Sequence, residues 1–469
     1  MSIQLFDSKE QAVRVFVPRV EGAVGMYVCG PTVQSSPHVG HLRSALVYDQ
    51  LRRWFSYRGL DVTLIRNVTD IDDKVLDNAQ DEPWWGLAYR MEREFTSAYE
   101  SLRILPPTYE PRATASISDM IALIERLISR GHAYVAPDGS GDVYFDTRTF
   151  PAYGALTNQS VDDMVDSDES DLRGKKDARD FALWKGHKVG EPESASWSTP
   201  WGAGRPGWHI ECSAMATKYL GPAFDIHGGG LDLRFPHHEN ELAQSSAAGD
   251  PFAQFWLHNG LVHIGGAKMS KSAGNSFYAA ELLTAHRPIV VRYFLGSAHY
   301  RSTLDLHDTA LAEAAAAFER IEAFLARGFR ADAHLAPAVH VPDDFAAAMD
   351  DDLGVPGALA VVFDTIRAGN TAFDAADIEA GLSAAGSVLA MLDVLGVNPR
   401  AGEWSQSSAA GSDLATGALD ALVGELIAAR AHARTNKDFA TSDRIRDELA
   451  AAGIVIEDTP DGAHWSLNG

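Results

Sequence analysis

Cysteine is scarce in this sequence. The 469-residue chain contains two cysteines, Cys29 and Cys212, which are far apart in the sequence. So low a count excludes the small secreted domains that depend on several disulfides. We therefore expect the two thiols to be metal ligands or simply buried side chains.

Signals for membranes and export are lacking as well. The sequence has no uninterrupted apolar run of about 20 residues, the length that a spanning helix requires. Its first ten residues hold neither a basic stretch nor an apolar core of the secretory kind. We expect a cytoplasmic protein without membrane contact and, since no segment indicates an oligomeric partner, a monomer.

Positive charge is in deficit. Lys and Arg number 40 against 64 Asp and Glu, which gives a formal net charge of −24. Phosphate binding relies on basic clusters, so this balance alone argues against a nucleic-acid partner. A large acidic enzyme can still carry a local basic face, and RNA binding therefore stays open.

The N-terminal region predicts a parallel sheet. Residues 25–29 form a short apolar run that ends at Gly30 and Pro31, and a second apolar run follows at residues 62–65. The segment between them, from His41, places apolar side chains on one helical face. Strand, helix and strand in this order favour a parallel sheet with ligands at the carboxyl ends of its strands.

The rest of the chain divides by pattern. Residues 117–128 have the spacing of an amphipathic helix, residues 133–146 look like a hairpin, and strand-like pieces return near 222–227 and 255–264. Beyond about residue 305 the pattern is helical and rich in Ala, and a Ser-rich linker precedes the last unit. The fold class that we predict is α/β: a Rossmann-like parallel-sheet catalytic domain with an insertion, followed by an α-helical bundle and a small C-terminal unit. The expected parts are 1–114 (first half of the nucleotide-binding domain), 115–200 (insertion), 201–265 (second half), 266–305 (connecting region with a lysine loop), 306–400 (bundle), 401–416 (linker) and 417–469 (C-terminal unit).

Two short motifs suit phosphate. His38, Gly40 and His41 follow a predicted strand and open a helix, where backbone N–H groups and the helix dipole favour anions. Gly40 allows a flat ring to approach the backbone closely. About 230 residues later, Lys268 and Lys271 lie in a loop of small polar residues that is suited to closing over a triphosphate. Taken singly, each motif is also compatible with capping histidines or a solvated loop.

In this order, the two motifs resemble those of class I aminoacyl-tRNA synthetases, with Val39 where isoleucine is commonest. The resemblance sharpens to cysteinyl-tRNA synthetases through further blocks between residues 25 and 275, and it is looser after residue 305. These blocks are Tyr-Val-Cys-Gly-Pro-Thr-Val at 27–33, Asn-Val-Thr-Asp-Ile-Asp-Asp-Lys at 67–74, Arg-Pro-Gly-Trp-His-Ile-Glu-Cys-Ser at 205–213, His-Gly-Gly-Gly-Leu-Asp-Leu at 227–233 and Phe-Pro-His-His-Glu-Asn-Glu at 235–241.

A zinc site is predicted from the residues and by the resemblance. His237 and Glu241 are four apart, so on a helix both side chains lie on one face. With the two cysteines they make a four-ligand set that matches zinc better than calcium or magnesium. Spacing alone leaves His238 or Glu239 open as alternatives. The resemblance implies one Zn²⁺ per chain, held by Cys29, Cys212, His237 and Glu241.

The resemblance also implies the substrate contacts. An amino-acid pocket lined by Cys29, Thr32, Thr69, Trp208 and His227 is expected. Gly229 and Asp232 are expected to approach ATP, with Asp232 accepting hydrogen bonds from the ribose. Mg²⁺ is expected to arrive with ATP. A magnesium cluster of Asp70, Asp72 and Asp73 is a less favoured alternative.

The C-terminal unit carries basic, aromatic and acidic side chains together on what its pattern predicts to be a helix and the segment after it. Such a mixture suits single-stranded RNA loops, although a solvated, salt-bridged helix is an equal alternative. The segment resembles the anticodon-reading end of the family, which often has Trp where Phe439 stands. The residues expected at the anticodon are Arg434, Asp438, Phe439, Asp443, Asp458 and Trp465.

The predicted activity is that of a cysteine–tRNA ligase. Cysteine is activated by ATP to the adenylate, with release of pyrophosphate, and is then transferred to the 3′ end of tRNA(Cys), giving AMP. His38, His41, Lys268 and Lys271 are expected to stabilise the phosphate charge. Two alternatives stay open: a cysteine ligase of mycothiol-type thiol biosynthesis, and a non-catalytic RNA-binding paralogue.

Overall fold

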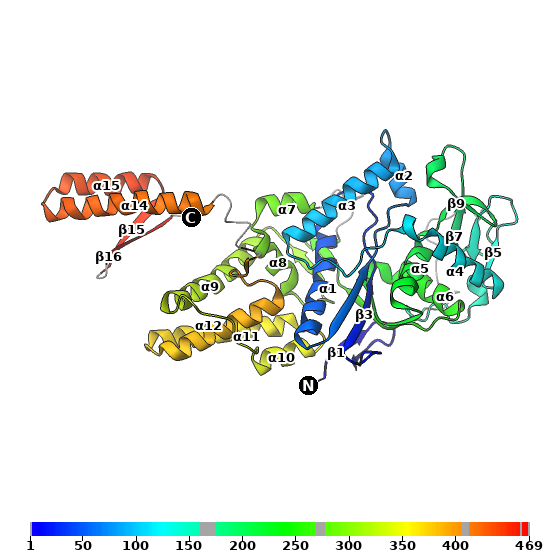
Figure 1. Ribbon diagram of the computed structural model, residues 1–469, viewed down its shortest axis with the longest axis horizontal. Helices are drawn as coiled ribbons and strands as arrows, with labels where there is room; N and C mark the ends of the chain where they lie inside the picture. The colour runs from blue at the N-terminus through cyan, green and yellow to red at the C-terminus, as the bar shows by residue number, and fades with distance from the viewer. Residues whose placement is uncertain are drawn as a thin grey trace. The chain divides into compact units, whose positions relative to one another are not determined.

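The computed structural model describes residues 2–159, 174–268, 277–402, 404, 412–459 and 462–467. The chain divides into two compact units, Met1–Asn398 and Pro399–Gly469. The first unit carries the sheet, the insertion and the helical bundle, and the second is a small unit of its own (Figure 1).

A four-stranded parallel sheet is the centre of the first unit. Its order is β11-β10-β3-β4, and every neighbouring pair is parallel. Met26, Tyr27 and Val28 in β3 are all buried, a continuous apolar run of the kind found where both faces of a parallel sheet are covered. The strands are β3 (Ala23–Val28), β4 (Asp61–Arg66), β10 (Ala223–Gly230) and β11 (Phe252–Asn259), and the helices nearest to them are α1 (Val39–Tyr57), α5 (Trp208–Leu220) and α6 (Glu239–Ala247).

The insertion is mostly antiparallel sheet. Five strands pair in the order β5-β6-β7-β9-β8, and the predicted hairpin at residues 133–146 is the β5–β6 pair. The sheet continues to Pro206 in β9. Its strands are β5 (Ala133–Val135), β6 (Val143–Phe145), β7 (Phe181–Gly186), β8 (Trp197–Thr199) and β9 (Gly202–Pro206), and before it come α2 (Asp73–Ala79), α3 (Trp84–Ser101), the short helix η1 (Ala113–Ser116) and α4 (Ile117–Ser129).

Gly260 divides the strand predicted at 255–264 into β11 and β12 (Val262–Ile264). A Cβ at Gly260 would lie 2.3 Å from the carbonyl oxygen of Ser302, so only glycine fits this close crossing. β12 pairs with β13 (Ala267–Lys268) and β14 (Leu304–Leu306). A two-stranded hairpin, β1 (Gln4–Asp7) with β2 (Ala12–Val15), opens the chain.

The predicted helical half is present and packs against α1. Among the described helices, α12 (Ile378–Leu395) is long and apolar enough to cross a membrane, which is weak evidence because much of it is buried in the bundle. The helices here are α7 (Ala279–Ala285), α8 (Pro288–Ser297), α9 (Ala310–Ala331), α10 (Asp343–Asp350), α11 (Val355–Asp374) and α12. The α/β class, with a parallel sheet followed by helices, is thus confirmed.

The second unit contains two helices where one was predicted. α14 (Ser412–Thr435) ends before Lys437, whose φ of 61° lies in the left-handed region, and Asp438 then caps α15 (Phe439–Ala451). The antiparallel pair β15 (Ile454–Thr459) and β16 (Gly462–Leu467) completes the unit. Its small core consists of Val423, Ile445, Leu449 and Ile454, with Trp465 among the side chains packed against it.

Candidate functional site

Four predicted metal ligands converge at the carboxyl end of β3. Cys29 follows β3, Cys212 lies in α5, Glu241 lies in α6 and His237 lies in the turn just before α6. One donor atom from each lies within 4.8 Å of the others. Three of the four side chains are fully buried, and Cys29 is partly exposed. The fold therefore assembles the set that the sequence proposed, although the four residues come from distant segments.

Glu241 is the hub of this cluster. Its Oε1 lies 3.3 Å from Sγ of Cys29 and 3.1 Å from Nε2 of His237, and its Oε2 lies 2.8 Å from Nε2 of His227. The two sulfur atoms are 3.6 Å apart. One carboxylate oxygen thus faces the proposed ligands, while the other holds a neighbouring imidazole.

His237 is held by two neighbours. Its Nδ1 lies 2.9 Å from Nδ1 of His209, and its ring stacks on Trp208 with centroids 4.1 Å apart. These contacts occupy Nδ1 and fix the ring plane, so Nε2 is the nitrogen turned toward Glu241 and the sulfur atoms. A metal-binding histidine ordinarily has such a partner on its other ring nitrogen.

A second ligand set is geometrically available. Cys29, His227, His238 and Glu241 also place one donor atom each within 4.8 Å of one another. The first set is better suited to zinc because it contributes two thiols instead of one. In addition, Nε2 of His227 is engaged with Glu241, and Nδ1 of His238 lies 2.8 Å from Nε2 of His258.

Glu239, the other alternative left open by spacing, points elsewhere. Its two oxygens accept hydrogen bonds from the backbone of Gly154 and from the backbone and hydroxyl of Thr157, at 2.9 to 3.0 Å. It fixes the loop after the insertion hairpin and is absent from both ligand sets.

Burial disfavours an isolated charge on any side chain of this cluster. It raises the pKa of the Cys29 thiol well above its usual range and raises that of Cys212, because a thiolate loses its water shell there. It also lowers the pKa of His237 well below its usual value. Without a cation, these shifts favour neutral thiols and a neutral imidazole, and a bound cation would favour the thiolates.

The histidine motif caps the helix that follows the first strand. His38 is the N-cap of α1, its Nδ1 accepts from the backbone N–H of Gly40 at 3.2 Å, and its own N–H donates to Nδ1 of His41 at 3.2 Å. The two rings stack with centroids 3.6 Å apart. These hydrogen bonds are those of helix-capping histidines, the alternative role left open above. The motif also lies at a helix N-terminus, where anions are favoured.

The lysine motif lies partly outside the described residues. Lys271 falls within 269–276, and Lys268 ends β13. The residues directly after the gap return to the histidine motif: the N–H of Val39 donates to the carbonyl of Phe277 at 3.0 Å, and that of Ala279 donates to Pro37 at 2.9 Å. The backbone hydrogen bonds therefore place residues 277–279, which follow the lysine motif, beside the start of α1.

The residues expected around the amino acid lie at the same end of the sheet as the candidate ligand cluster. Thr32 and Thr69 form a parallel bridge, and the Thr69 hydroxyl donates to Oε2 of Glu211 at 2.8 Å. Trp208 and His227 lie against the cluster through His237 and Glu241. The structure thus brings Thr32, Thr69, Trp208, His227 and Cys29 to one end of the sheet.

Three residues that hydrogen-bond to predicted site residues were not themselves predicted from the sequence. Asn67 accepts from the Gly30 N–H at 2.8 Å, and its Oδ1 lies 3.6 Å from Sγ of Cys212. Glu211 is buried, which raises its pKa well above the usual range. Asn67, His209 and Glu211 lie inside the sequence blocks quoted above, directly beside predicted residues. Their spacing alone does not indicate a functional role.

The glycine-rich run ends β10 beside the histidines. A Cβ on Gly229 would lie 2.8 Å from Cε1 of His238, so the position requires glycine. Asp232 follows in the short helix η5 (Leu231–Leu233) and is exposed. The next turn, η6 (Arg234–His238), presents His237 and His238 to the interior.

The alternative magnesium cluster is not assembled. Asp70 accepts from the Thr114 N–H at 3.0 Å, Asp72 accepts from the Lys74 N–H at 3.0 Å, and Asp73 pairs with Lys185 at 2.5 Å. The three carboxylates thus serve three separate contacts. They fix the loop after β4 and the start of α2.

The residues predicted at the anticodon differ in their surroundings. Phe439 is 63% exposed, whereas Trp465 packs against the small core of the second unit. Asp438 caps α15 through the Thr441 N–H, and Asp443 pairs with Arg446 at 3.2 Å. Arg434 lies in the last turn of α14. Asp458 lies in β15, and its side chain is outside the described part of the chain.

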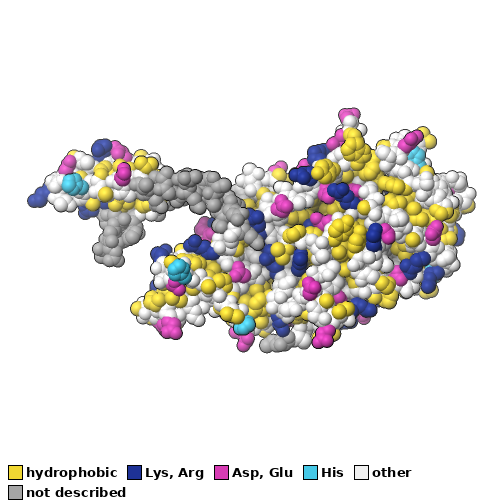
Figure 2. Space-filling view, viewed as in Figure 1, with side chains coloured by type: hydrophobic (Ala, Val, Ile, Leu, Met, Phe, Trp, Pro, Cys, Tyr) yellow, Lys and Arg dark blue, Asp and Glu magenta, His cyan; other side chains and the backbone are white. Residues whose placement is uncertain are grey.

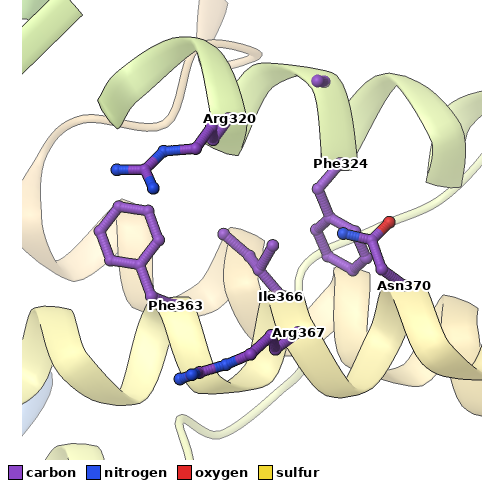
Figure 3. Close-up of a pocket in the computed structure, with 7 residues that line it drawn as sticks. Arg320, Phe324, Phe363, Ile366, Arg367 and Asn370 are labelled. Atoms are coloured by element: carbon purple, nitrogen blue, oxygen red, sulfur yellow. The ribbon is translucent and has the colours of Figure 1, made fainter. Parts of the chain in front are cut away.

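A separate hollow of about 510 Å³ lies between α9 and α11 of the bundle (Figure 3). Arg320 and Arg367 lie on one side of it with Phe363 near them, Ile366 lies in the middle, and Phe324 lies beside Asn370 on the other side. The guanidinium of Arg320 is 5.3 Å from the centre of the Phe363 ring. None of the residues predicted for chemistry lines this hollow.

Comparisons with family models cover most of the chain. A model described as tRNA synthetases class I (C) catalytic domain matches residues 15–316, one described as DALR domain matches 344–398, and one described as cysteinyl-tRNA ligase anticodon binding domain matches 416–465. The first match contains every proposed metal ligand and both phosphate motifs.

Whole-chain relatives and solved structures agree with these matches. The chain is 64% identical to a cysteine–tRNA ligase of Clavibacter sepedonicus and 62% identical to one of Leifsonia xyli subsp. xyli, each over 100% of both chains. A Mycobacterium tuberculosis methionyl-tRNA synthetase in complex with methionyl-adenylate has a TM-score of 0.59 at 16% identity and covers 80% of this chain and 90% of its own. At that identity the solved structure shows the fold alone.

Proposed function

The chain belongs to the cysteine–tRNA ligase family, and from that premise we propose that Cys29, Cys212, His237 and Glu241 hold a zinc ion by which the enzyme selects cysteine. The enzyme activates cysteine with ATP and transfers it to tRNA(Cys). The observation that carries the zinc proposal is the convergence of the four donor atoms within 4.8 Å.

The donor set fits zinc in number and in chemistry. Two soft thiols, one borderline imidazole and one carboxylate oxygen make a four-ligand set of the donor types that zinc binds in proteins. His209 and His227 supply the outer hydrogen bonds that such ligands ordinarily have. Bound zinc would supply a Lewis acid that favours a thiolate over a neutral hydroxyl.

The need for such a device follows from the substrate. Cysteine differs from serine by one atom, and an apolar pocket separates close analogues by only about 1–3 kcal/mol. We propose that Thr32, Thr69, Trp208 and His227 bind and orient the amino acid beside the cluster, with Glu211 fixing the hydroxyl of Thr69. Their positions around one end of the sheet support this role.

For the ATP half of the site we propose a charge-stabilising role for His38, His41, Lys268 and Lys271. Gly40 and Gly229 allow close approach of the nucleotide, Asp232 accepts from the ribose, and Mg²⁺ accompanies the phosphates. The pairing of residues 37–39 with 277–279 supports a common site for the two motifs, because it joins their flanking backbones.

For the second unit we propose contact with the anticodon through Arg434, Asp438, Phe439, Asp443, Asp458 and Trp465. The exposed ring of Phe439 supports a stacking role, whereas Trp465 is engaged with the small core. A cytoplasmic, monomeric enzyme and the predicted domain boundaries are also proposals. The two rival functions lose their support, since the cysteine–tRNA ligase relatives match the whole chain, second unit included.

The zinc proposal is tested by metal analysis and ATP–pyrophosphate exchange. Purified enzyme is expected to contain about one zinc per chain and to exchange with cysteine but not with serine. Cys212→Ser is expected to lose most of the metal and most of the exchange. Ser245→Ala is a matched control, because Ser245 is buried on α6 one turn after Glu241 and its hydroxyl has no hydrogen-bond partner among the residues that the structure describes. Active enzyme without zinc would refute the proposal.

A further inference from the structure

The helix α3 has two unlike faces. Its buried face covers the histidine motif: the ring of Phe95 meets His41 edge-on with centroids 4.9 Å apart, and the sulfur of Met91 lies 4.0 Å from the hydroxyl of Ser36. Its outer face carries Trp85 and Tyr89, which are 59% and 54% exposed. One wall of the candidate nucleotide site thus turns two large aromatic rings toward solvent.

These two rings form one stripe with a cation. Trp85, Tyr89 and Arg93 are spaced four apart, so they lie along one side of the helix. Arg93 is exposed and has no ion-pair partner in the described part of the chain. The guanidinium of Arg112, from the segment before η1, lies 5.9 Å from the centre of the Tyr89 ring and is paired with Glu92 at 2.9 Å, so Arg93 is the cation of the stripe that is available to a phosphate. Figure 2 shows hydrophobic side chains gathered at the α2–α3 corner with Lys and Arg side chains beside them.

The size of the stripe favours a nucleic acid over a protein partner. Two aromatic side chains bury roughly 300–500 Å² together, whereas a stable protein interface buries about 800 Å² on each partner. The other exposed positions near the stripe are charged or small and polar, with Arg90 paired to Glu82 and Glu94, and they add little apolar area. Aromatic rings with a cation beside them are the pattern that binds unpaired bases and their phosphates.

The substrate tRNA has a single-stranded segment that must come close to α3. Its 3′ end is single-stranded and must reach the carboxyl ends of the strands, where the other face of α3 covers His41. We propose that the outer face of α3, formed by Trp85, Tyr89 and Arg93, binds the single-stranded 3′ end of tRNA by stacking its bases on the two rings. This inference rests on the tRNA-ligase function and adds a surface that the zinc and phosphate sites do not include.

The test compares two RNAs and two kinds of variant. Dissociation constants are measured for tRNA(Cys) and for the same tRNA lacking its single-stranded 3′ nucleotides, with the wild type, with W85A/Y89A, and with W85F/Y89F, which keeps both rings. Stacking on each ring is expected to be worth about tenfold in affinity. W85A/Y89A should therefore bind intact tRNA at least tenfold more weakly and bind the shortened tRNA as the wild type does, while W85F/Y89F stays within about threefold.

Cysteine-dependent ATP–pyrophosphate exchange without tRNA is the control for folding and for the zinc site. It should be unchanged in W85A/Y89A, because both side chains are exposed. Unchanged affinity for intact tRNA would overturn the proposal, and so would an equal loss for both RNAs, which would place the contact elsewhere on tRNA. A wild-type enzyme that binds tRNA but lacks zinc or cysteine-dependent exchange would refute the proposed metal site and leave this surface intact.

Discussion

Replacing Arg292 by Met is expected to destabilise the first unit, because this arginine joins three parts of it. Arg292 in α8 is 1% exposed, and its guanidinium pairs with Asp49 of α1 at 2.5 Å. It also donates to the carbonyls of Leu102, Arg103 and Leu395 at 3.0 Å. The helix α1, the segment after α3 and the end of α12 thus share one buried cation.

The magnitude follows from what the substitution leaves behind. Breaking a buried pair by removing one partner costs about 3–5 kcal/mol, since the other charge stays buried. Asp49 keeps Arg53 at 2.8 Å and the N–H of Leu105 at 2.9 Å, which places the cost near the lower end. We expect Arg292→Met to lower the free energy of unfolding of the first unit by about 3 kcal/mol.

The pH dependence of the pair provides a second measure. Burial by itself raises the pKa of Asp49, but the charges of Arg292 and Arg53 and the Leu105 N–H outweigh it, so the pKa in the folded state is lowered. A carboxyl with a lowered folded pKa contributes stability that is fully present above its unfolded pKa of about 4 and is lost as the pH falls through the folded value. Arg292→Met should remove much of this acid-side dependence.

Urea unfolding followed by fluorescence, at several pH values, measures both effects. The double variant Asp49→Leu/Arg292→Met is the matched control, because replacing both members of a buried pair by apolar groups is often neutral. It is expected to be more stable than Arg292→Met alone. A cost below about 1 kcal/mol for Arg292→Met, or no recovery in the double variant, would refute the reasoning.

Two further predictions concern the reaction. Lys271→Ala should slow adenylate formation strongly, because the lysine acts on phosphate, while a cobalt-substituted metal site keeps its spectral response to cysteine. Loss of both adenylate formation and the cobalt response would mean that the loop has a structural role. A chain ending at Asn398, the boundary of the first compact unit, should retain cysteine-dependent exchange but charge tRNA far more slowly, because stacking alone is worth roughly 1–3 kcal/mol per base. Equal charging by the shortened and full-length chains would contradict a tRNA-binding role for the second unit.

Local patterns in the sequence predicted local structure well. The helix at residues 117–128 and the hairpin at 133–146 are present, because each is specified by periodicity and turn residues within a dozen positions. The break at Lys437 was missed, since a single left-handed residue leaves the helical pattern on both sides intact. The division at Gly260 was missed because its cause, the carbonyl of Ser302, lies 42 residues further along the chain, at positions 260 and 302 of the sequence.

The candidate site also depends on long-range contacts that local sequence patterns do not contain. Spacing placed His237 and Glu241 on one face but left His238 and Glu239 open, because all four residues fall within five consecutive positions. Tertiary contacts distinguish these residues. Glu239 accepts a hydrogen bond from Thr157 and His238 contacts His258, whereas His237 contacts His209. Such partners are fixed only when the insertion, β11 and α5 come together, so a sequence read segment by segment does not contain them.

Burial also explains why the proposed selection depends on a cation. The cluster that raises the thiol pKa values of Cys29 and Cys212 has a low effective dielectric, which penalises a thiolate that has no partner. The same low dielectric strengthens the attraction between a bound dication and a thiolate, while a neutral hydroxyl gains much less from it. An exposed set of the same four ligands would bind metal but would discriminate less between cysteine and serine, because water would compete with the substrate sulfur for the metal. The depth of the cluster, and not its ligand list alone, is therefore what the proposed selectivity requires.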